Sequence, residues 1–334
     1  MITVLTGLIR NLSPKVFEFR KLLQPIYSEF SRKPVCISTK NPSLKMTQAT
    51  QNPSQQQKQK VIITNKCGNK IVGILHESAT KEIVILCHGL RSTKEDNIMT
   101  NLAASLENAG ISSFRFDFTG NGESEGSFEF GHYWREVEDL HDVVQHFHRE
   151  NRIVIAIIGH SKGGSVVLLY ASKYYDIKAV VNLSGRYDLK AGLEERLGKD
   201  YLEIIRRDGF IDVMQSGIHF ILLYYHLRTS AIEGNFDYRV TKESLMDRLD
   251  TNMHEACLQI DKTCRVLTVH GSSDTVIPVE DASEFAKIIP NHELHIIEGA
   301  DHSYTNHQDE LASVVVNCIK ETLLHDKGTS SYLC

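Results

Sequence analysis

The sequence GHSKGG at residues 159–164 sets one serine, Ser161, among small residues, with an apolar run on each side. A residue that leaves a strand and enters a helix in one step takes a strained backbone conformation, and its neighbours must be small because strand and helix come very close together. Gly159 and Gly163 meet that requirement. The G-x-S-x-G pattern therefore predicts a nucleophile elbow, which exposes the Ser161 hydroxyl above a sheet, at the start of a helix.

A serine hydroxyl is a poor nucleophile, so it needs a base, and the base needs a carboxylate to orient it. Asp274 lies just after one later apolar run, 265–271, and His302 lies just after the next, 293–299. Because the carboxyl ends of parallel strands meet at one edge of a sheet, we expect Ser161, Asp274 and His302 to meet there. Asp301 is a rival carboxylate, but a residue adjacent to the histidine points the other way. The predicted chemistry is acyl transfer by a Ser–His–Asp triad.

Acyl transfer also needs two preorganised N–H donors for the oxyanion that forms. We predict that one is the backbone amide of Lys162, directly after the nucleophile. The other is predicted to be the amide of Leu90, in the sharp turn HGLRS at 88–92. His88 and His160 flank these turns and are predicted to be structural rather than catalytic.

The elements that must position these residues alternate between strands and helices. Alternation of this kind predicts an α/β fold with right-handed crossovers and a mainly parallel sheet flanked by helices. It pauses over 186–258, which we interpret as an inserted cap domain. After a hairpin at 61–77, the expected strands are 82–89, 111–118, 153–159, 179–185, 265–271 and 293–299, and the expected helices are 95–110, 132–151, 165–175, 280–288 and 309–325.

The N-terminal region differs in composition from the rest. Residues 1–46 carry eight Lys or Arg against two acids, so the net charge of −5 divides into about +6 for this head and −11 for the remainder. The head is interpreted as a targeting segment, with an unaddressed tail as the alternative. The polar stretch 47–60 is predicted to be a disordered linker. We expect an intracellular protein, located in a plastid or other organelle if the head is a transit peptide, and cytoplasmic if translation begins at Met46.

Composition also narrows the partners and cofactors. The acidic remainder of the chain, after residue 46, has no electrostatic reason to bind nucleic acid. No apolar run reaches the length of about 18 residues that is needed to span a membrane. Seven cysteines without a CxxC pair indicate free thiols in a reducing compartment. No phosphate-binding glycine loop or zinc-ligand spacing is found, so neither a cofactor nor a metal is expected. The histidines excluded as metal ligands, because they do not share one helix face, are at 141, 146 and 148.

Five segments together resemble the α/β-hydrolase superfamily, and within it the serine aminopeptidase-like proteins of the feruloyl (cinnamoyl) esterase type. They are CHGLRSTKEDN (87–97), RFDFTGNGESEG (115–126), GHSKGG (159–164), HGSSDTVIP (270–278) and GADHSY (299–304). The resemblance implies an α/β-hydrolase domain at 61–328, an eight-stranded sheet, a cap after the sixth strand, and ester hydrolysis without a cofactor. Asp117 is expected to hold the loop beside the nucleophile.

Lys162 departs from the family pattern, which often has a less charged residue at this position. Its ammonium group would either favour anionic or phenolic substrates or lie along the protein surface, and the surface location is the one we expect.

These observations predict a serine hydrolase that cleaves a small-molecule carboxylic ester through an acyl-enzyme intermediate. The predicted cap segment 209–227 is rich in Phe, Ile, Leu and Tyr, which suits an apolar or aromatic acyl group. The same triad would also serve an acyltransferase, a thioesterase or a peptidase. A ligand receptor built on a hydrolase scaffold is a further alternative, because a fold alone does not determine function.

Overall fold

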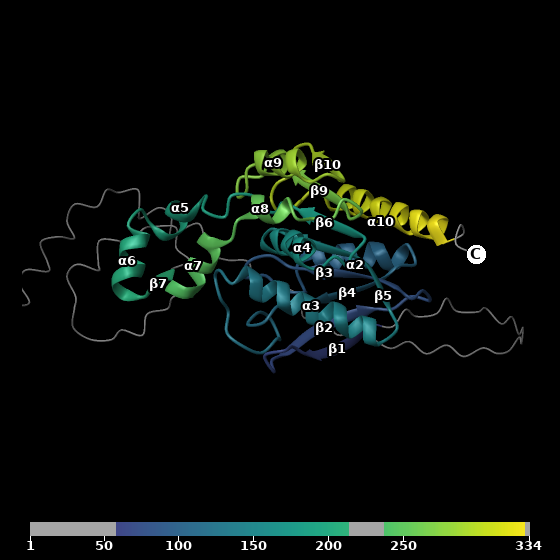
Figure 1. The fold of residues 1–334 in the computed structure, drawn as a ribbon, viewed down its shortest axis with the longest axis horizontal. Helices are drawn as coiled ribbons and strands as arrows, with labels where there is room; N and C mark the ends of the chain where they lie inside the picture. Colours follow the sequence, from purple (N-terminus) through teal and green to yellow (C-terminus); the bar gives the residue numbers. More distant parts are fainter. Residues whose placement is uncertain (1–57, 214–236, 331–334) are drawn as a thin grey trace, which may run out of the picture. The chain divides into compact units, whose positions relative to one another are not determined.

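The computed structural model describes residues 58–213 and 237–330. The predicted targeting segment, most of the predicted linker and residues 214–236 of the predicted cap lie outside the described residues. Eight strands form one sheet in the order β1-β2-β4-β3-β5-β6-β9-β10 (Figure 1). Their bounds are β1 Lys58–Thr64, β2 Lys70–His76, β3 Glu82–Cys87, β4 Ser112–Phe116, β5 Ile153–His160, β6 Ala179–Leu183, β9 Arg265–Gly271 and β10 His292–Ile297.

Strands β1, β2 and β4 are joined by antiparallel pairings, and every other pairing in this sheet is parallel. The predicted eight-stranded, mainly parallel sheet is therefore confirmed. The central strands β3, β5 and β6 are almost wholly buried, which explains why they read as continuous apolar runs.

Helices cover both faces of the sheet. One apolar cluster joins it to α3, α4, α8 and α9, and a second joins it to α2 and α10. No helix in the described ranges is both long and apolar enough to cross a membrane. The helices are α2 Asn97–Asn108, α3 Tyr133–Arg149, α4 Lys162–Lys173, α8 Met253–Cys257, α9 Glu280–Ile288 and α10 Gln308–Ser330.

The predicted linker is too long at its C-terminal end. Strand β1 begins at Lys58, which pairs with His76 of β2, so residues 58–60 are part of the sheet. The error has a physical cause. Only Ile63 of β1 is buried, because an edge strand is held by backbone hydrogen bonds to one neighbour and tolerates charged side chains. Its first residues therefore look like linker in composition.

An insertion between β6 and β9 forms a separate group of elements beside the sheet (Figure 1). Its described elements have an apolar core of their own, to which Phe130 of the β4–α3 loop also belongs. The predicted range 186–258 includes α8, yet Met253 and Cys257 of that helix are buried in the main core. The insertion's own elements are α5 Leu193–Leu197, α6 Tyr201–Asp208, β7 Phe210–Val213, β8 Tyr238–Thr241 and α7 Lys242–Asp250.

Candidate active site

Ser161 lies between β5 and α4 in a conformation that L-residues rarely adopt, with φ 57° and ψ −117°. Its amide donates to the carbonyl of Leu183 at 2.8 Å, which ties the turn to the end of β6. Gly163 faces backbone at such close range that a Cβ there would lie 2.5 Å from the His88 oxygen and 2.6 Å from the Cys87 oxygen. Gly159 in turn packs against the backbone of Gly163. Small residues are required here by space.

The structure brings Ser161, Asp274 and His302 into one hydrogen-bonded chain. His302 Nε2 lies 3.1 Å from Ser161 Oγ, and His302 Nδ1 lies 2.7 Å from Asp274 Oδ2. Because Nδ1 faces a carboxylate, it carries the ring proton, which leaves Nε2 free to accept from the serine hydroxyl. This arrangement can withdraw a proton from Ser161 as its oxygen attacks a carbonyl carbon.

Asp274 is fully buried as a side chain and is held from several directions. Its Oδ1 accepts from the amides of Val276 at 2.8 Å and Ile277 at 2.9 Å. Burial acts to raise the pKa of Asp274, but hydrogen bonds from His270, His302 and the Ile277 amide outweigh it and hold this pKa well below its usual range. The carboxylate therefore stays ionised beside His302.

His270 was not among the residues predicted from the sequence. Its Nε2 lies 3.0 Å from the Ile277 carbonyl oxygen and 3.3 Å from Asp274 Oδ2. Its Nδ1 is buried and has no hydrogen-bond partner within residues 58–213 and 237–330. The polar contacts of the ring are therefore made by Nε2, which faces the turn that holds Asp274. The available signal was its position four residues before the carboxylate, in HGSSD.

His302 is supported through its backbone. His160 Nε2 lies 2.8 Å from the His302 carbonyl oxygen, and burial lowers the pKa of His160 to about 4. A neutral His160 that donates from Nε2 satisfies this contact, which is the structural role expected for it. Asp301 accepts from the amide of Thr305 at 2.8 Å and from its hydroxyl at 2.7 Å, so this rival carboxylate is engaged elsewhere.

The turn after β3 lies directly against the serine. A Cβ on Gly89 would be 3.1 Å from the Ser161 Cβ, and Leu90 is the next residue. His88 closes this turn: its Nδ1 lies 2.8 Å from the Gly89 oxygen, and its Nε2 accepts from the Phe118 amide at 3.1 Å. Since Nε2 accepts, Nδ1 holds the proton. Burial lowers the pKa of His88, which favours this neutral form and the structural role predicted for the residue.

The two amides expected to hold the oxyanion lie next to these contacts. Lys162 is the first residue of α4, and the amides in the first turn of a helix have no partner inside it. The positive end of the helix dipole adds to the attraction for a negative oxygen. In the described part of the chain, neither the Leu90 amide nor the Lys162 amide donates a hydrogen bond to a backbone carbonyl in a turn or loop.

Asp117 holds the loop after β3 through hydrogen bonds to its carboxylate. Its carboxylate accepts from the amide of Lys94 at 2.6 Å, from Lys94 Nζ at 2.7 Å and from the amide of Glu123 at 2.9 Å. Asp117 is fully buried, and Gly122 packs against its carboxylate. The loops after β3 and β4 are thus joined, which is the structural role that the resemblance implied for Asp117.

The predicted surface location of the Lys162 side chain is wrong. The Lys162 side chain is only 3% exposed, and its Nζ lies 2.7 Å from Glu136 Oε1 in α3. Its ammonium group therefore lies against helix α3 and not at the protein surface. A lysine stem is long enough to reach a buried partner one helix away, and the sequence pattern around residue 162 carries no information about that partner.

The structure also contains a cavity of about 470 Å³. Its walls are the loop after β3 at 91–93, the loop after β4 at 120–129, and β8. Ser161 and His302 do not line it. The residues predicted at 214–227 to form an apolar wall lie outside the described part of the chain.

Comparison with known proteins agrees with this architecture. Residues 78–207 match the family model described as Serine aminopeptidase, S33. An uncharacterised protein of Saccharomyces cerevisiae is 24% identical over 243 residues, which cover 67% of this chain and 69% of that protein. Est1E of Butyrivibrio proteoclasticus, solved with ferulic acid bound, superposes with a TM-score of 0.59 at 23% identity, over 79% of this chain and 99% of Est1E. The esterase Pf2001 of Pyrococcus furiosus has a TM-score of 0.59 at 20% identity, over 80% of this chain and 91% of the esterase.

The chain therefore has the α/β-hydrolase fold. Its resemblance to the α/β-hydrolase superfamily, and within it to serine aminopeptidase-like and feruloyl-esterase-like proteins, is confirmed.

Proposed function

We propose that this protein is a serine hydrolase that cleaves a carboxylic ester through an acyl-enzyme intermediate. The observation that carries the proposal is the hydrogen-bonded chain from Ser161 Oγ through the His302 ring to Asp274, with contacts of 3.1 and 2.7 Å. Ser161 lies at a strained turn directly before a helix. A nucleophile is exposed at such a turn, and a developing negative charge is favoured there.

The proposed reaction follows from these positions. Ser161 Oγ attacks the ester carbonyl carbon as His302 Nε2 takes the hydroxyl proton, and Asp274 stabilises the imidazolium that results. The amides of Leu90 and Lys162 bind the oxyanion. His302 then gives its proton to the departing alcohol, which leaves an acyl group on Ser161. Water repeats the same sequence to release the acid and restore the serine.

The acyl group is proposed to be apolar or aromatic. Leu90 and Phe128 are half-buried and pack against the core of the insertion, so the residue that offers an oxyanion amide also presents an apolar side chain beside the site. The described part of the apolar segment expected to line the substrate, 209–213, contains β7 (Phe210–Val213), and Ile211 within this strand is buried in the insertion's own core. The likeness to Est1E, which binds ferulic acid, makes an aromatic carboxylic ester a suitable first substrate.

Ser161→Ala tests the proposal directly. We expect turnover of p-nitrophenyl esters to fall by about 10³-fold or more, because residual catalysis comes from binding and the oxyanion donors alone. Ser172→Ala is the matched control, because the Ser172 hydroxyl lies in the last turn of the same helix and donates to the Leu169 carbonyl. The turnover of this variant should be unchanged. A fluorophosphonate probe should label the wild type and Ser172→Ala but not Ser161→Ala. Wild-type activity in Ser161→Ala would refute the assignment.

A peptidase is the second candidate, because the matching family model is described as a serine aminopeptidase. The same triad cleaves amides when the site binds an amine leaving group. Comparing kcat/KM for aminoacyl anilides and for esters of the same acyl group separates the two. We expect the ester to be favoured by much more than its greater intrinsic reactivity explains, and equal rates would favour the peptidase.

A further inference from the structure

Helices α3 and α4 are bridged by two glutamate–lysine pairs. Glu138 pairs with Lys173, and Glu136 pairs with Lys162. The two pairs differ in burial, since the Lys173 side chain is 45% exposed and the Lys162 side chain is 3% exposed. Burial raises the pKa of Glu136, against the opposing effect of Lys162. A buried ion pair is costly to desolvate, and apolar residues of similar volume often stabilise a helix contact better. The Glu136–Lys162 pair therefore calls for a reason beyond holding two helices together.

That reason is suggested by the other partners of Lys162. Its Nζ lies 2.6 Å from the carbonyl oxygen of Gly131 and 3.4 Å from that of Glu129. An ammonium group has three N–H donors, so Glu136 and these two carbonyls account for all of them. Lys162 thus clamps segment 129–131 to the first residue of α4, directly after the nucleophile.

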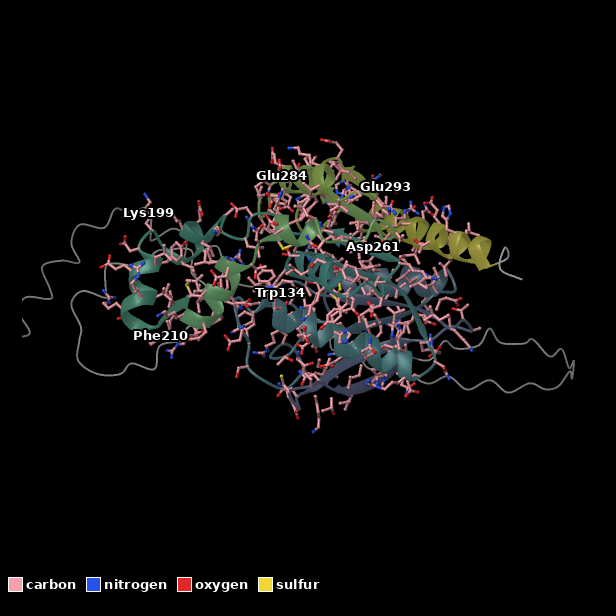
Figure 2. The ribbon with its side chains drawn as sticks, viewed as in Figure 1. Trp134, Lys199, Phe210, Asp261, Glu284 and Glu293 are labelled. Atoms are coloured by element: carbon pink, nitrogen blue, oxygen red, sulfur yellow. The ribbon has the colours of Figure 1, made fainter. Side chains whose placement is uncertain are left out.

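The clamped segment is also where the insertion rests on the main body. Phe130 belongs to the core of the insertion. A Cβ on Gly131 would overlap the carbonyl oxygen of Ser244 in α7, so the two backbones are in direct contact. The amide of Tyr133 donates to Asp247 Oδ2 of α7 at 2.9 Å. In Figure 2, Trp134 on the first turn of α3 and Phe210 in β7 mark the two groups of elements that this segment joins.

We propose that the Glu136–Lys162 pair is a positioning element for acyl-group specificity. The pair fixes segment 129–133, and with it the insertion, relative to the nucleophile turn. It thereby sets the space between Ser161 and the apolar side chains of Leu90 and Phe128, which pack on the insertion. The side chains of Glu136 and Lys162 contact each other and segment 129–131 and do not touch the reacting atoms. Both therefore act through the segment that they hold. This inference rests on the proposed esterase function.

Glu136→Gln tests the inference, with Glu138→Gln as its control. Both variants remove one carboxylate from α3 that pairs with a lysine of α4, but only Glu136 shares its lysine with segment 129–131. For Glu136→Gln we expect the ratio of kcat/KM for a cinnamoyl ester to that for an acetyl ester to fall about tenfold, mainly through KM of the larger acyl group. For Glu138→Gln the ratio should stay within about twofold of wild type.

A double variant guards against a folding defect in Glu136→Gln. Lys162→Met with Glu136→Leu replaces both charges by side chains of similar volume, which a buried site generally tolerates. Hydrogen exchange then reports on the link without any turnover. We expect faster exchange in segment 129–133 and in α7 of the double variant, and wild-type exchange there in Glu138→Gln.

The outcomes separate this inference from the proposed function. Unchanged exchange in the double variant, or an unchanged ester ratio in a folded Glu136→Gln, would overturn the positioning role. An equal change in Glu138→Gln would also overturn it, because the effect would then belong to the helix contact. If exchange rises as expected but the wild type hydrolyses no ester and takes up no fluorophosphonate, the proposed function fails and the mechanical link stands.

Discussion

At the residue scale, the serine turn depends on close backbone packing as much as on backbone strain. Ser161 has a positive φ that the surrounding bonds hold in place, and the glycines beside it leave no room for a side chain. This crowding links the nucleophile to the turn after β3, because the backbone that faces Gly163 belongs to Cys87 and His88. A small group added at Gly163 is therefore expected to disturb both Ser161 and the turn that carries the proposed oxyanion donor Leu90.

Gly163→Ala should cost about 1–3 kcal/mol of unfolding free energy through overpacking. It should also reduce ester turnover, because the displaced backbone carries Leu90. Gly110→Ala is the control, since no atom lies within 4 Å of its added Cβ and only the positive φ of 75° is unfavourable. That control should lose about 1 kcal/mol and keep full activity. Urea denaturation and p-nitrophenyl ester assays measure both, and full activity in Gly163→Ala would contradict the crowding argument.

At the scale of elements, ion pairs fasten the loops that carry the site. Asp117→Asn keeps the shape of the side chain but leaves buried Lys94 with less negative charge nearby. Breaking one partner of a buried pair costs about 3–5 kcal/mol. We expect kcat to fall more than KM rises, because the loosened turn carries Leu90, the proposed oxyanion donor, whose contact would be made in the transition state. Steady-state kinetics on the folded variant would contradict this if only KM changed.

Helices α3 and α4 and the β1–β2 turn meet at Glu138. Burial opposes ionisation there, but hydrogen bonds from Lys173, Lys66 and Tyr174 lower the pKa of Glu138 from 4.5 to about 2. A folded-state pKa below the unfolded value means that the ionised group stabilises the fold above pH 4.5, and that this contribution is lost as the pH falls through 2.

Glu138→Gln should therefore be less stable than wild type at pH 6, by about 1 kcal/mol for this partly exposed network. The difference should narrow as the pH is lowered from 4.5 toward 2. Urea midpoints of the two proteins across this range measure it, and a difference that widens toward acid would show the sign to be wrong.

At the scale of the whole molecule, the described elements that position the proposed site all begin at or after Lys58. The sheet begins with β1, and Ser161, Asp274 and His302 all lie on turns after its parallel strands. A chain that begins at Met46 keeps every described element, so we expect its kcat/KM for esters to be within about twofold of the full chain.

A chain that begins at Asn65 should behave differently from the Met46 form. It loses β1, which pairs along its full length with β2, and it removes Ile63 from the core. Its unfolding temperature should be lower, because β2 loses its pairing with β1 and becomes the edge strand of the sheet, paired only with β4. Thermal denaturation of the two truncated chains distinguishes them, and equal unfolding temperatures would show that β1 contributes nothing to stability.

Much of this architecture could be predicted because its signals are local. The alternation of buried strands and amphipathic helices follows from the period of apolar residues, and the serine turn follows from glycines two residues on either side of Ser161. The positions of Asp274 and His302 after two core strands led to the expectation that they meet Ser161, and the three lie in hydrogen-bond contact. Their catalytic roles remain a prediction.

The features that the sequence could not reveal depend on contacts between residues far apart in the chain. Strand β1 is recognisable only from its pairing with β2, because an edge strand needs few apolar side chains. Lys162 was assigned to the surface by residue type, yet its charge is buried against α3. Only the tertiary structure decides which carboxylate and carbonyls surround an ammonium group. Types and spacing in the sequence determined where the chemistry would lie, whereas folding decided which side chains hold it in place.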